Sequence, residues 1–326
     1  MLKFAMISKW HVHADGYAKF VQKQPDASIS CVWDEDAVRG KAWAEELGVD
    51  FVADYDAVLA RDDVDAILVC TPTNMHKEVM IKAANAGKHI FTEKVLALTT
   101  ADADEIIAAI EKNGVKFSIC YPHRCMPRNL VLKQLVDDGQ LGDITVMRVR
   151  NVHDGALAGW LPDYWYDPET TGGGAMMDLG AHGMYLAHWL LGEPVRIQSM
   201  FNNLTPVPVD DNAICTIEFA NKGIAITETS LVSPMAPTTL ELYGTKGVAM
   251  YSDNEVKFRN EFTRKYVEGG WVTPKLPEEL PHPIRQFIDG VLYGEEIIFD
   301  TKEARMLTNL MEKAYIADKE RREVNF

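Results

Sequence analysis

The sequence predicts an α/β fold in two domains, and three observations carry this prediction. Short apolar runs and helix-like segments alternate regularly over residues 1–120. Several of the helix-like segments stop at a glycine, which is the residue that most often closes a helix. Beyond residue 120 the apolar runs lengthen and turn signals separate them, which favours antiparallel strands. A chain of 326 residues is long enough to bury two cores.

The first domain, residues 1–120, is expected to alternate strands with helices. The expected strands are Lys3–Ser8, Ser28–Trp33, Ala66–Cys70, His89–Thr92 and Lys116–Cys120. The expected helices are Ala14–Gln22, Asp36–Leu47, Asn74–Ala86 and Thr100–Asn113. The run AILVC is continuously apolar, as in strands that are buried on both faces of a sheet. This alternation predicts a doubly wound parallel sheet of the Rossmann type, the fold that binds dinucleotides.

The second domain, residues 121–326, is expected to be a large, mostly antiparallel open sheet backed by helices. The expected strands are Ile144–Val152, Ala213–Phe219, Gly223–Leu231, Thr238–Tyr243 and Val248–Tyr251. The expected helices are Met126–Asp137, Ala175–Leu191 and Lys302–Arg321. We interpret this half as the substrate-binding and oligomerisation domain. An open sheet with apolar strands favours a homodimer or homotetramer assembled through that sheet.

Composition excludes several classes of partner. The net charge of −15 argues against nucleic acid and against anionic membranes, because both are negatively charged. No window approaches the roughly 18 apolar residues of a membrane span, and the first apolar run is too short for a signal peptide. The five cysteines are widely spaced and form neither a disulfide framework nor a zinc motif. We therefore expect a cytoplasmic protein that acts on a small molecule.

The loop after the first strand departs from the usual dinucleotide fingerprint. A G-x-G-x-x-G loop is expected here, because glycine lets the backbone approach the pyrophosphate. No glycine occurs before Gly16, and the candidate cofactor-binding residues are Ser8, Lys9, Trp10, His11 and His13. The two histidines are also a possible metal pair, but no third ligand is spaced nearby, so no metal is predicted. We expect Lys9, His11 or His13 to donate to phosphate oxygens, with Trp10 as a wall of the cofactor cleft.

Asp34 ends the second strand, where a Rossmann carboxylate binds the ribose hydroxyls of adenosine. Its negative charge would repel a 2′-phosphate and so favours NAD over NADP, although Arg39 on the following helix could offset this. The alternative role for Asp34 is to cap the helix that begins near Asp36.

Two further segments lie at the carboxyl ends of predicted strands, the edge where doubly wound sheets bind ligands. The first contributes the cofactor-binding candidates Thr71, Pro72, Asn74 and His76, although Asn74 would also serve as a helix cap. The second ends in Glu93 and Lys94. A lysine there can donate to a hydroxyl or carbonyl oxygen of a substrate, whereas an isolated lysine is more often a solvated surface residue.

Asp178 and His182 follow three consecutive glycines at the start of a predicted helix. Their i,i+4 spacing places both side chains on one helical face. Histidine is suited to proton transfer near neutral pH, and the helix dipole favours an anion at Asp178. On spacing alone, such a pair is usually only a surface pair.

The segments AGKHIFTEKV and WYDPETTGGGAMMDLGAHGMYLAHWLLG together resemble the glucose–fructose oxidoreductase and inositol dehydrogenase family, Gfo/Idh/MocA. The similarity continues through TPTNMH, YPHRCMP and the terminal helix. It implies NAD(P)-linked oxidation or reduction of sugars, cyclitols or their derivatives. Lys94 matches the lysine of the family's E-K-P motif, and Asp178 and His182 match its D-x-x-x-H pair. These three residues are therefore the expected catalytic set.

The resemblance implies hydride transfer between a carbinol carbon and nicotinamide. His182 would take the hydroxyl proton, Lys94 would polarise the same oxygen, and Asp178 would orient the substrate or keep His182 basic. The expected substrate-binding residues are Arg124, His153, Asp154, Trp160 and Trp165. Local packing would explain these five equally well.

Three departures from the family pattern stand out. The glycine fingerprint is missing, Val95 replaces the proline of E-K-P, and Tyr185 stands where an acidic residue is frequent. Two other functions stay open at this point. One is an NAD-using glycosidase or lyase that oxidises its substrate transiently, and the other is a non-catalytic sensor that binds a dinucleotide.

Overall fold

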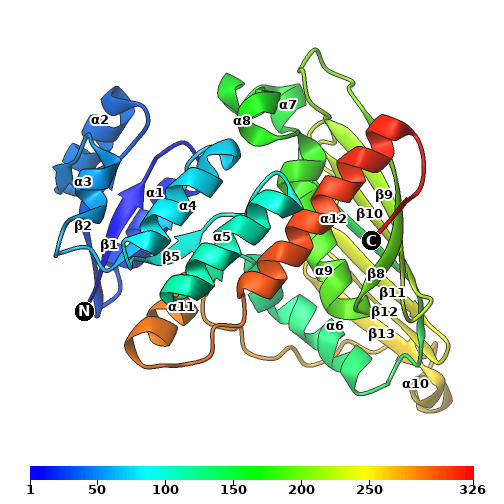
Figure 1. Cartoon of the computed structure of the whole chain (residues 1–326). Helices are drawn as coiled ribbons and strands as arrows, with labels where there is room; N and C mark the ends of the chain where they lie inside the picture. Colours follow the sequence, from blue (N-terminus) through cyan, green and yellow to red (C-terminus); the bar gives the residue numbers. More distant parts are fainter. The chain divides into compact units, whose positions relative to one another are not determined.

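The computed structural model describes all residues, 1–326, and they form two compact units. Unit 1 comprises residues 1–121 and 281–308, and unit 2 comprises residues 122–280 and 309–326. Figure 1 shows the course of the chain from the N-terminus to the C-terminus. The division expected from the sequence placed residues 281–308 in the second domain, whereas in the structure they belong to unit 1.

Unit 1 contains a six-stranded sheet in the order β3-β2-β1-β4-β5-β6, with every neighbouring pair parallel. Its strands are β1 Leu2–Ile7, β2 Ala27–Trp33, β3 Asp50–Phe51, β4 Ala66–Val69, β5 His89–Thr92 and β6 Phe117–Ile119. The predicted doubly wound parallel sheet is confirmed. The strand order reverses between β1 and β4, and such a reversal is where doubly wound sheets bind nucleotides.

The helices of unit 1 follow the predicted alternation. They are α1 Ala14–Gln22, α2 Ala37–Leu47, α3 Tyr55–Leu59, α4 His76–Asn85, α5 Thr100–Asn113 and α11 Pro283–Leu292. Gly48 and Gly114 close α2 and α5 with φ of 71° and 62°, a left-handed conformation that suits glycine. The helix predicted at Asn74–Ala86 begins later, because a 3₁₀ turn at Thr73–Met75 precedes α4.

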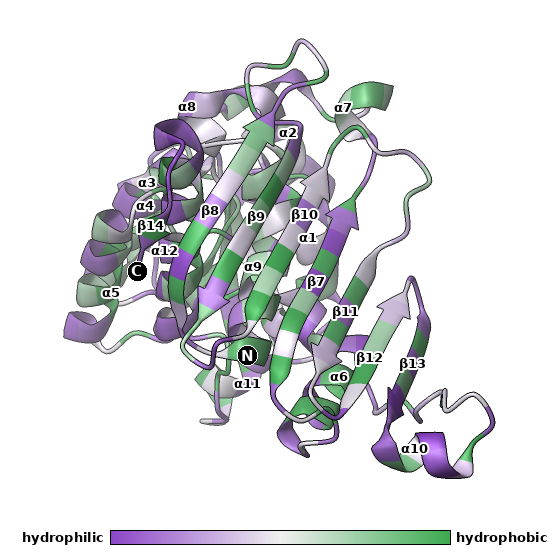
Figure 2. Cartoon of the chain, turned by 90° about the vertical axis from the view of Figure 1, so that its right-hand side faces the viewer, coloured by the Kyte–Doolittle hydropathy of each residue, from purple (hydrophilic) through white to green (hydrophobic).

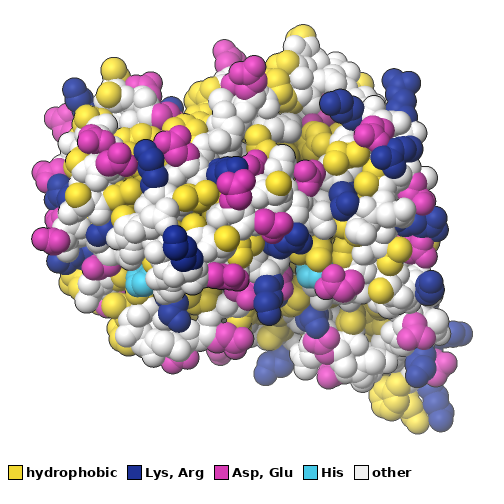
Figure 3. Space-filling view, in the orientation of Figure 1, with side chains coloured by type: hydrophobic (Ala, Val, Ile, Leu, Met, Phe, Trp, Pro, Cys, Tyr) yellow, Lys and Arg dark blue, Asp and Glu magenta, His cyan; other side chains and the backbone are white.

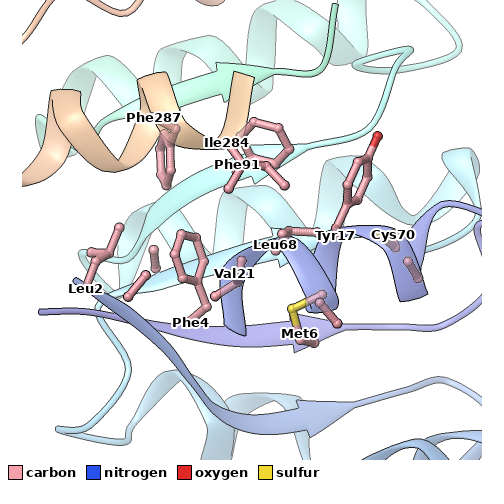
Figure 4. Close-up of a cluster of buried hydrophobic side chains, with 14 of the residues drawn as sticks. Leu2, Phe4, Met6, Tyr17, Val21, Leu68, Cys70, Phe91, Ile284 and Phe287 are labelled. Carbon is pink, nitrogen blue, oxygen red and sulfur yellow. The ribbon is translucent and has the colours of Figure 1, made fainter. Parts of the chain in front are cut away.

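Helix α11 explains why residues 281–308 belong to unit 1. Its Phe287 ring lies 6.0 Å from the ring of Phe4 in β1 and 5.7 Å from that of Phe91 in β5. Ile284 joins the same fully buried cluster (Figure 4). Arg285 adds an ion pair with Asp26 at 2.7 Å. The apolar face of this helix is therefore part of the core beneath the parallel sheet.

Unit 2 contains an eight-stranded sheet in the order β13-β12-β11-β7-β10-β9-β8-β14 (Figure 2). The strands are β7 Ile144–Val152, β8 Pro194–Asn202, β9 Asn212–Phe219, β10 Ile224–Ser230, β11 Thr239–Gly244, β12 Gly247–Ser252, β13 Glu255–Asn260 and β14 Val324–Asn325. Only β7 and β10 pair in parallel. The predicted mostly antiparallel sheet is confirmed, with this one parallel pair as the exception.

Helices cover one face of this sheet, and α9, Ala181–Leu191, packs on β7 and β10. The other helical segments of unit 2 are α6 Pro127–Asp137, α7 Gly155–Ala158, α8 Pro168–Thr171 and α10 Glu261–Tyr266. The helix predicted at Ala175–Leu191 is divided, because a π-helical turn, η4 at Met176–Gly180, precedes α9. Helix α12, Thr301–Glu320, continues from unit 1 into unit 2.

The distribution of charged side chains and the burial of the cysteines are those of an ordinary globular protein. Acidic and basic side chains are interspersed over the face seen in Figure 3. The five cysteines form no disulfide with one another and are all buried, so they behave as small core residues. None of the helices combines the length and the apolar character needed to cross a membrane.

Candidate functional site

The loop after β1 uses its main-chain amides within unit 1. The N–H of Lys9 donates to Asp34 Oδ2 at 2.8 Å, and the N–H of Trp10 donates to Ser8 Oγ at 3.0 Å. The N–H of His11 donates to the carbonyl of Cys70 at 3.0 Å. Ser8 stands at the first glycine position of the fingerprint and adopts φ of 72°. Ser8 thus keeps the left-handed backbone conformation of a fingerprint glycine. The main-chain N–H groups of the next three residues are hydrogen-bonded within the protein.

The side chains of this loop point in two directions. Lys9 Nζ pairs with Asp15 at 2.9 Å and with Glu46 at 3.0 Å. Trp10 is buried, at 6% exposure. His11 and His13 both turn toward Glu93 at the end of β5, where His13 Nδ1 lies 2.7 Å from Glu93 Oε1. The sequence spacing hides this third group, because Glu93 follows His13 by 80 residues.

Asp34 lies at the end of β2, as predicted, and its side chain is fully buried. Arg39 binds it through two nitrogens, with Nε 3.0 Å from Oδ2 and Nη2 2.6 Å from Oδ1. Arg39 also pairs with Glu35 at 2.6 Å. The alternative role of Asp34 as a helix cap is wrong, because Asp36 caps α2 by accepting the N–H groups of Val38 and Arg39.

The segment after β4 is tied to the residues that follow β5. His76 is buried, and its Nδ1 lies 3.0 Å from the carbonyl oxygen of Val95 and 3.1 Å from that of Leu96. Burial lowers the pKa of His76 although neighbouring carbonyl oxygens oppose the shift. Thr71 and Pro72 are buried and Asn74 is exposed, with no side-chain cap at the start of α4. His76 therefore braces this edge of the sheet.

Glu93 and Lys94 are both buried at the end of β5. Glu93 Oε2 accepts the main-chain N–H of Lys94 at 2.9 Å, and Glu93 Oε1 accepts a hydrogen bond from the hydroxyl of Tyr17. Burial alone would raise the pKa of Glu93, but the neighbouring histidines and Lys94 hold it well below its usual range. The Lys94–Val95 peptide bond is cis.

In unit 2, Gly173 and Gly174 allow a very close approach of the chain to Tyr315 and Asp210. A Cβ on Gly173 would stand 1.9 Å from the Tyr315 hydroxyl, and one on Gly174 would stand 1.9 Å from the carbonyl oxygen of Asp210. The Asp210 carboxylate accepts the N–H groups of Gly174 at 2.8 Å and Met176 at 2.7 Å, and the Tyr315 hydroxyl at 2.8 Å. This arrangement fixes the start of the segment that carries Asp178 and His182.

His182 lies in a cluster that sequence reasoning identified only in part. Its Nδ1 lies 2.8 Å from the hydroxyl of Tyr185, which also accepts the main-chain N–H of His123 at 3.2 Å. The His123 ring stacks on the His182 ring, with centroids 4.2 Å apart. Tyr185 therefore contacts the proposed base directly. The YPHRCMP segment held the only sequence signal for His123.

Three of the expected substrate-binding residues come together in unit 2. The Trp160 ring lies 4.7 Å from the His153 ring, and its Nε1 donates to Asp154 Oδ1 at 3.1 Å. Asp178 acts electrostatically on His153, whose pKa is nevertheless lowered by burial. This cluster places a carboxylate and an imidazole beside an indole ring.

The other two expected substrate-binding residues are buried. Arg124 lies with its guanidinium 5.0 Å from the ring centroid of Trp189. Trp165 is 5% exposed. Their burial is compatible with packing as well as with a binding role, so their role stays a prediction.

A dinucleotide can be tested against the geometry of unit 1. Asp34, the segment Thr71–Asn74, and Glu93 with Lys94 stand at the carboxyl edge where the fold binds such a ligand. The carboxylate, hydroxyl and ammonium groups suit ribose and nicotinamide contacts. A pyrophosphate would fit this loop differently from a G-x-G-x-x-G loop, because the main-chain N–H groups of Lys9, Trp10 and His11 already donate hydrogen bonds within the protein.

Comparison with known proteins gives two family matches. Residues 11–121 match the model described as an oxidoreductase family with an NAD-binding Rossmann fold. Residues 130–250 match the model of the GFO/IDH/MocA C-terminal domain. Together the two models account for most of the chain, and they follow each other in the order of units 1 and 2.

Individual relatives include two curated dehydrogenases. The inositol 2-dehydrogenase of Rhizobium meliloti is 24% identical over 322 residues, covering 95% of this chain and 94% of the relative. The D-glucoside 3-dehydrogenase of Escherichia coli is 29% identical over 247 residues, covering 70% of each. Among solved structures, GenD2 from gentamicin A biosynthesis, in complex with NAD, superposes with a TM-score of 0.86 at 25% identity. That match covers 100% of this chain and 96% of GenD2.

Proposed function

We propose, from the premise that this chain belongs to the GFO/IDH/MocA family of NAD-binding oxidoreductases, that it transfers hydride between a nicotinamide cofactor and a carbinol carbon of a sugar or cyclitol. The observation that carries this proposal is the cluster around His182. A histidine that is 8% exposed and contacts a tyrosine hydroxyl through Nδ1 is held in one orientation. Such a residue can accept a hydroxyl proton as the hydride leaves.

Lys94 is proposed to hold and polarise the reacting oxygen. Its side chain is buried at the carboxyl end of β5, where the cofactor side of a Rossmann sheet lies. A buried ammonium stabilises developing negative charge on an alkoxide more strongly than a solvated one does. Asp178 is proposed to orient a substrate hydroxyl, because it lies close enough to His153 to act on it electrostatically.

NAD is the proposed cofactor, in preference to NADP. The Asp34 carboxylate lies where the adenosine ribose is expected, and a 2′-phosphate would be repelled there. Arg39 is committed to Asp34 and Glu35, which reduces its capacity to bind that phosphate. NAD, when bound, would accept the hydride, while the residues named above manage the proton and orient the substrate.

The proposed substrates are polyhydroxylated rings, as suggested by the names of the inositol and glucoside dehydrogenase relatives. His153, Asp154 and Trp160 supply hydrogen-bonding groups beside an aromatic ring, a combination that suits a sugar ring. The proposed assembly is a homodimer or homotetramer. Exposed apolar side chains on unit 2 strands support it: Val195, Met200, Ile214, Ile224 and Tyr243.

Substitution of the proposed catalytic residues tests this function. In Lys94→Ala and His182→Ala, kcat should fall by about a hundredfold or more, because general acid–base groups contribute roughly 10²–10⁴ in rate. The Kd for NAD should stay within a few-fold of the wild-type value. Turnover near the wild-type rate in either variant would remove that residue from the proposed mechanism.

A further inference from the structure

We infer that His11, His13 and Glu93 form a binding site for a divalent transition-metal ion, with Zn²⁺ as the best-matched ion. Each residue offers one ligand atom, and these atoms all lie within 4.8 Å of one another. The two histidines come from the loop after β1, and the carboxylate follows β5. Two imidazole nitrogens and one carboxylate oxygen form a donor set that Zn²⁺ uses in catalytic sites.

The distances between the ligand atoms suit a tetrahedral ion. Two ligands at about 2.0–2.1 Å from a tetrahedral Zn²⁺ lie about 3.3–3.4 Å from each other. Glu93 Oε1 lies 2.7 Å from His13 Nδ1 and 3.7 Å from His11 Nδ1. These two separations bracket the required value, and all three ligand atoms lie within 4.8 Å of one another, so rotations of the side chains would bring them to one ion.

The protonation of the histidines allows this coordination. In the neutral form of His11 with the proton on Nε2, the lone pair of Nδ1 accepts the main-chain N–H of His13 at 3.2 Å. A metal ion would take that lone pair in exchange for a long hydrogen bond. At His13, Nδ1 would exchange its hydrogen bond to Glu93 Oε1 for a bond to the ion. Binding would therefore compete with protons.

Surrounding groups hold the carboxylate in place and leave one side of the site open. Glu93 Oε2 accepts the N–H of Lys94 at 2.9 Å, and Oε1 accepts the hydroxyl of Tyr17, which holds Oε1 beside the histidines with its second lone pair available to an ion. The side chains of Glu93 and His11 are 3% and 6% exposed, whereas that of His13 is 48% exposed. Three protein ligands with one accessible side are typical of sites that keep a position for water or for an oxygen of a bound molecule.

The three side chains are also candidate cofactor-binding residues, but the readout of this inference, metal affinity, needs neither cofactor nor substrate. The competing explanation is a hydrogen-bonded His–Glu cluster that binds no metal. The two explanations differ in metal affinity, which can be measured without any substrate. NAD binding is measured separately on the chelator-treated protein, so failure of one idea is distinguishable from failure of the other.

The test uses the full chain after treatment with a chelator and dialysis. Zn²⁺ is titrated by calorimetry, and Co²⁺ by its visible absorption, which reports the coordination geometry. The wild-type protein should bind a single ion per chain and give the intense visible bands of tetrahedral Co²⁺. His13→Ala and Glu93→Gln should each weaken Zn²⁺ binding by about a hundredfold or more, because even loss of an outer-shell partner costs roughly 10–100-fold.

Val12→Ala is the matched control, because Val12 lies between the two histidines, is 47% exposed and offers no ligand atom. It should bind Zn²⁺ with wild-type affinity. His13 is half exposed, so its replacement should leave the fold intact, and thermal unfolding checks this. Wild-type protein that binds neither ion would overturn the inference. Wild-type affinity in both His13→Ala and Glu93→Gln would also overturn it, since the ion would then bind elsewhere.

Discussion

The hydroxyl of Tyr185 lies 2.8 Å from Nδ1 of His182, and this contact orients the imidazole from within its own helix. Both side chains belong to α9, three residues apart, so the helix geometry itself brings them together. The same hydroxyl accepts the N–H of His123, which ties the pair to the segment before α6. The Tyr185 hydroxyl therefore connects His182 to that segment.

Loss of the Tyr185 hydroxyl should slow the reaction without abolishing it. We expect Tyr185→Phe to lower kcat about tenfold and to shift the pH dependence of kcat, because His182 loses its fixed partner. The KM should change little. Tyr251→Phe, which removes another buried hydroxyl from unit 2, is the control and should keep the wild-type pH profile. Identical profiles for the two variants would show that Tyr185 has only a packing role.

Asp210 should be a major determinant of the stability of unit 2. Asp210→Ala leaves the N–H groups of Gly174 and Met176 and the Tyr315 hydroxyl without their acceptor. We expect the free energy of unfolding to fall by about 2–4 kcal/mol, and by about 1–2 kcal/mol in Tyr315→Phe. Urea unfolding measures both values. A loss below about 1 kcal/mol in Asp210→Ala would contradict this account of the glycine-rich turn.

The ion pair between Asp26 and Arg285 should make stability depend on acid pH. Hydrogen bonding from Arg285 lowers the pKa of Asp26 to about 2 from a usual 3.8. Since the folded pKa lies below the unfolded one, the contribution is full above pH 4 and is lost as pH falls toward 2. We expect Asp26→Asn to destabilise the protein by about 1 kcal/mol near neutral pH, after allowance for solvent screening.

The two proteins should converge in stability as the pH falls through that window. Urea unfolding of wild type and Asp26→Asn at several pH values measures the difference. A difference that stays constant from neutral pH to pH 2 would assign the effect to something other than the charge of Asp26.

Asp34 should set the preference between the two nicotinamide cofactors. Wild-type protein should bind NAD more tightly than NADP, and Asp34→Ser should reduce that ratio about tenfold or more by removing the charge and releasing Arg39. Glu35→Gln removes the other carboxylate partner of Arg39 and should leave the preference close to wild type. Calorimetric titration of both cofactors decides, and tighter binding of NADP by the wild type would contradict the proposal.

Elements with strong local signals could be predicted from the sequence, and elements set by distant contacts could not. The strand His89–Thr92 was predicted with its observed bounds, and so was Ile144–Val152. By contrast, the predicted helix Ala175–Leu191 is divided by the π-helical turn at Met176–Gly180, and N–H groups at its start are bound by Asp210 from 34 and 36 residues away. No local pattern contains that information.

Two other elements show the limits of local patterns. Helix α11 has a proline in its first turn and apolar residues at 284, 287, 288 and 291, which is the pattern of an amphipathic helix. This helix was not predicted from the sequence, because these residues lie in the half of the chain that was assigned to the antiparallel sheet. Strand β8 has exposed apolar residues such as Met200, so its alternation is weak. The site shows the same limit, since the parallel sheet brings Glu93 to the His11 and His13 loop across 80 residues.

The central claim, that this chain catalyses net oxidation of a polyol ring with NAD, is tested most directly by following NADH formation. Purified protein is incubated with NAD and a panel of cyclitols, free sugars and glucosides, with His182→Ala measured in parallel. The account predicts that at least one member of the panel yields NADH in equal amount to the ketone formed, and that His182→Ala is slower by about a hundredfold or more. Consumption of a glycoside without net NADH, or equal rates in the two proteins, would contradict it.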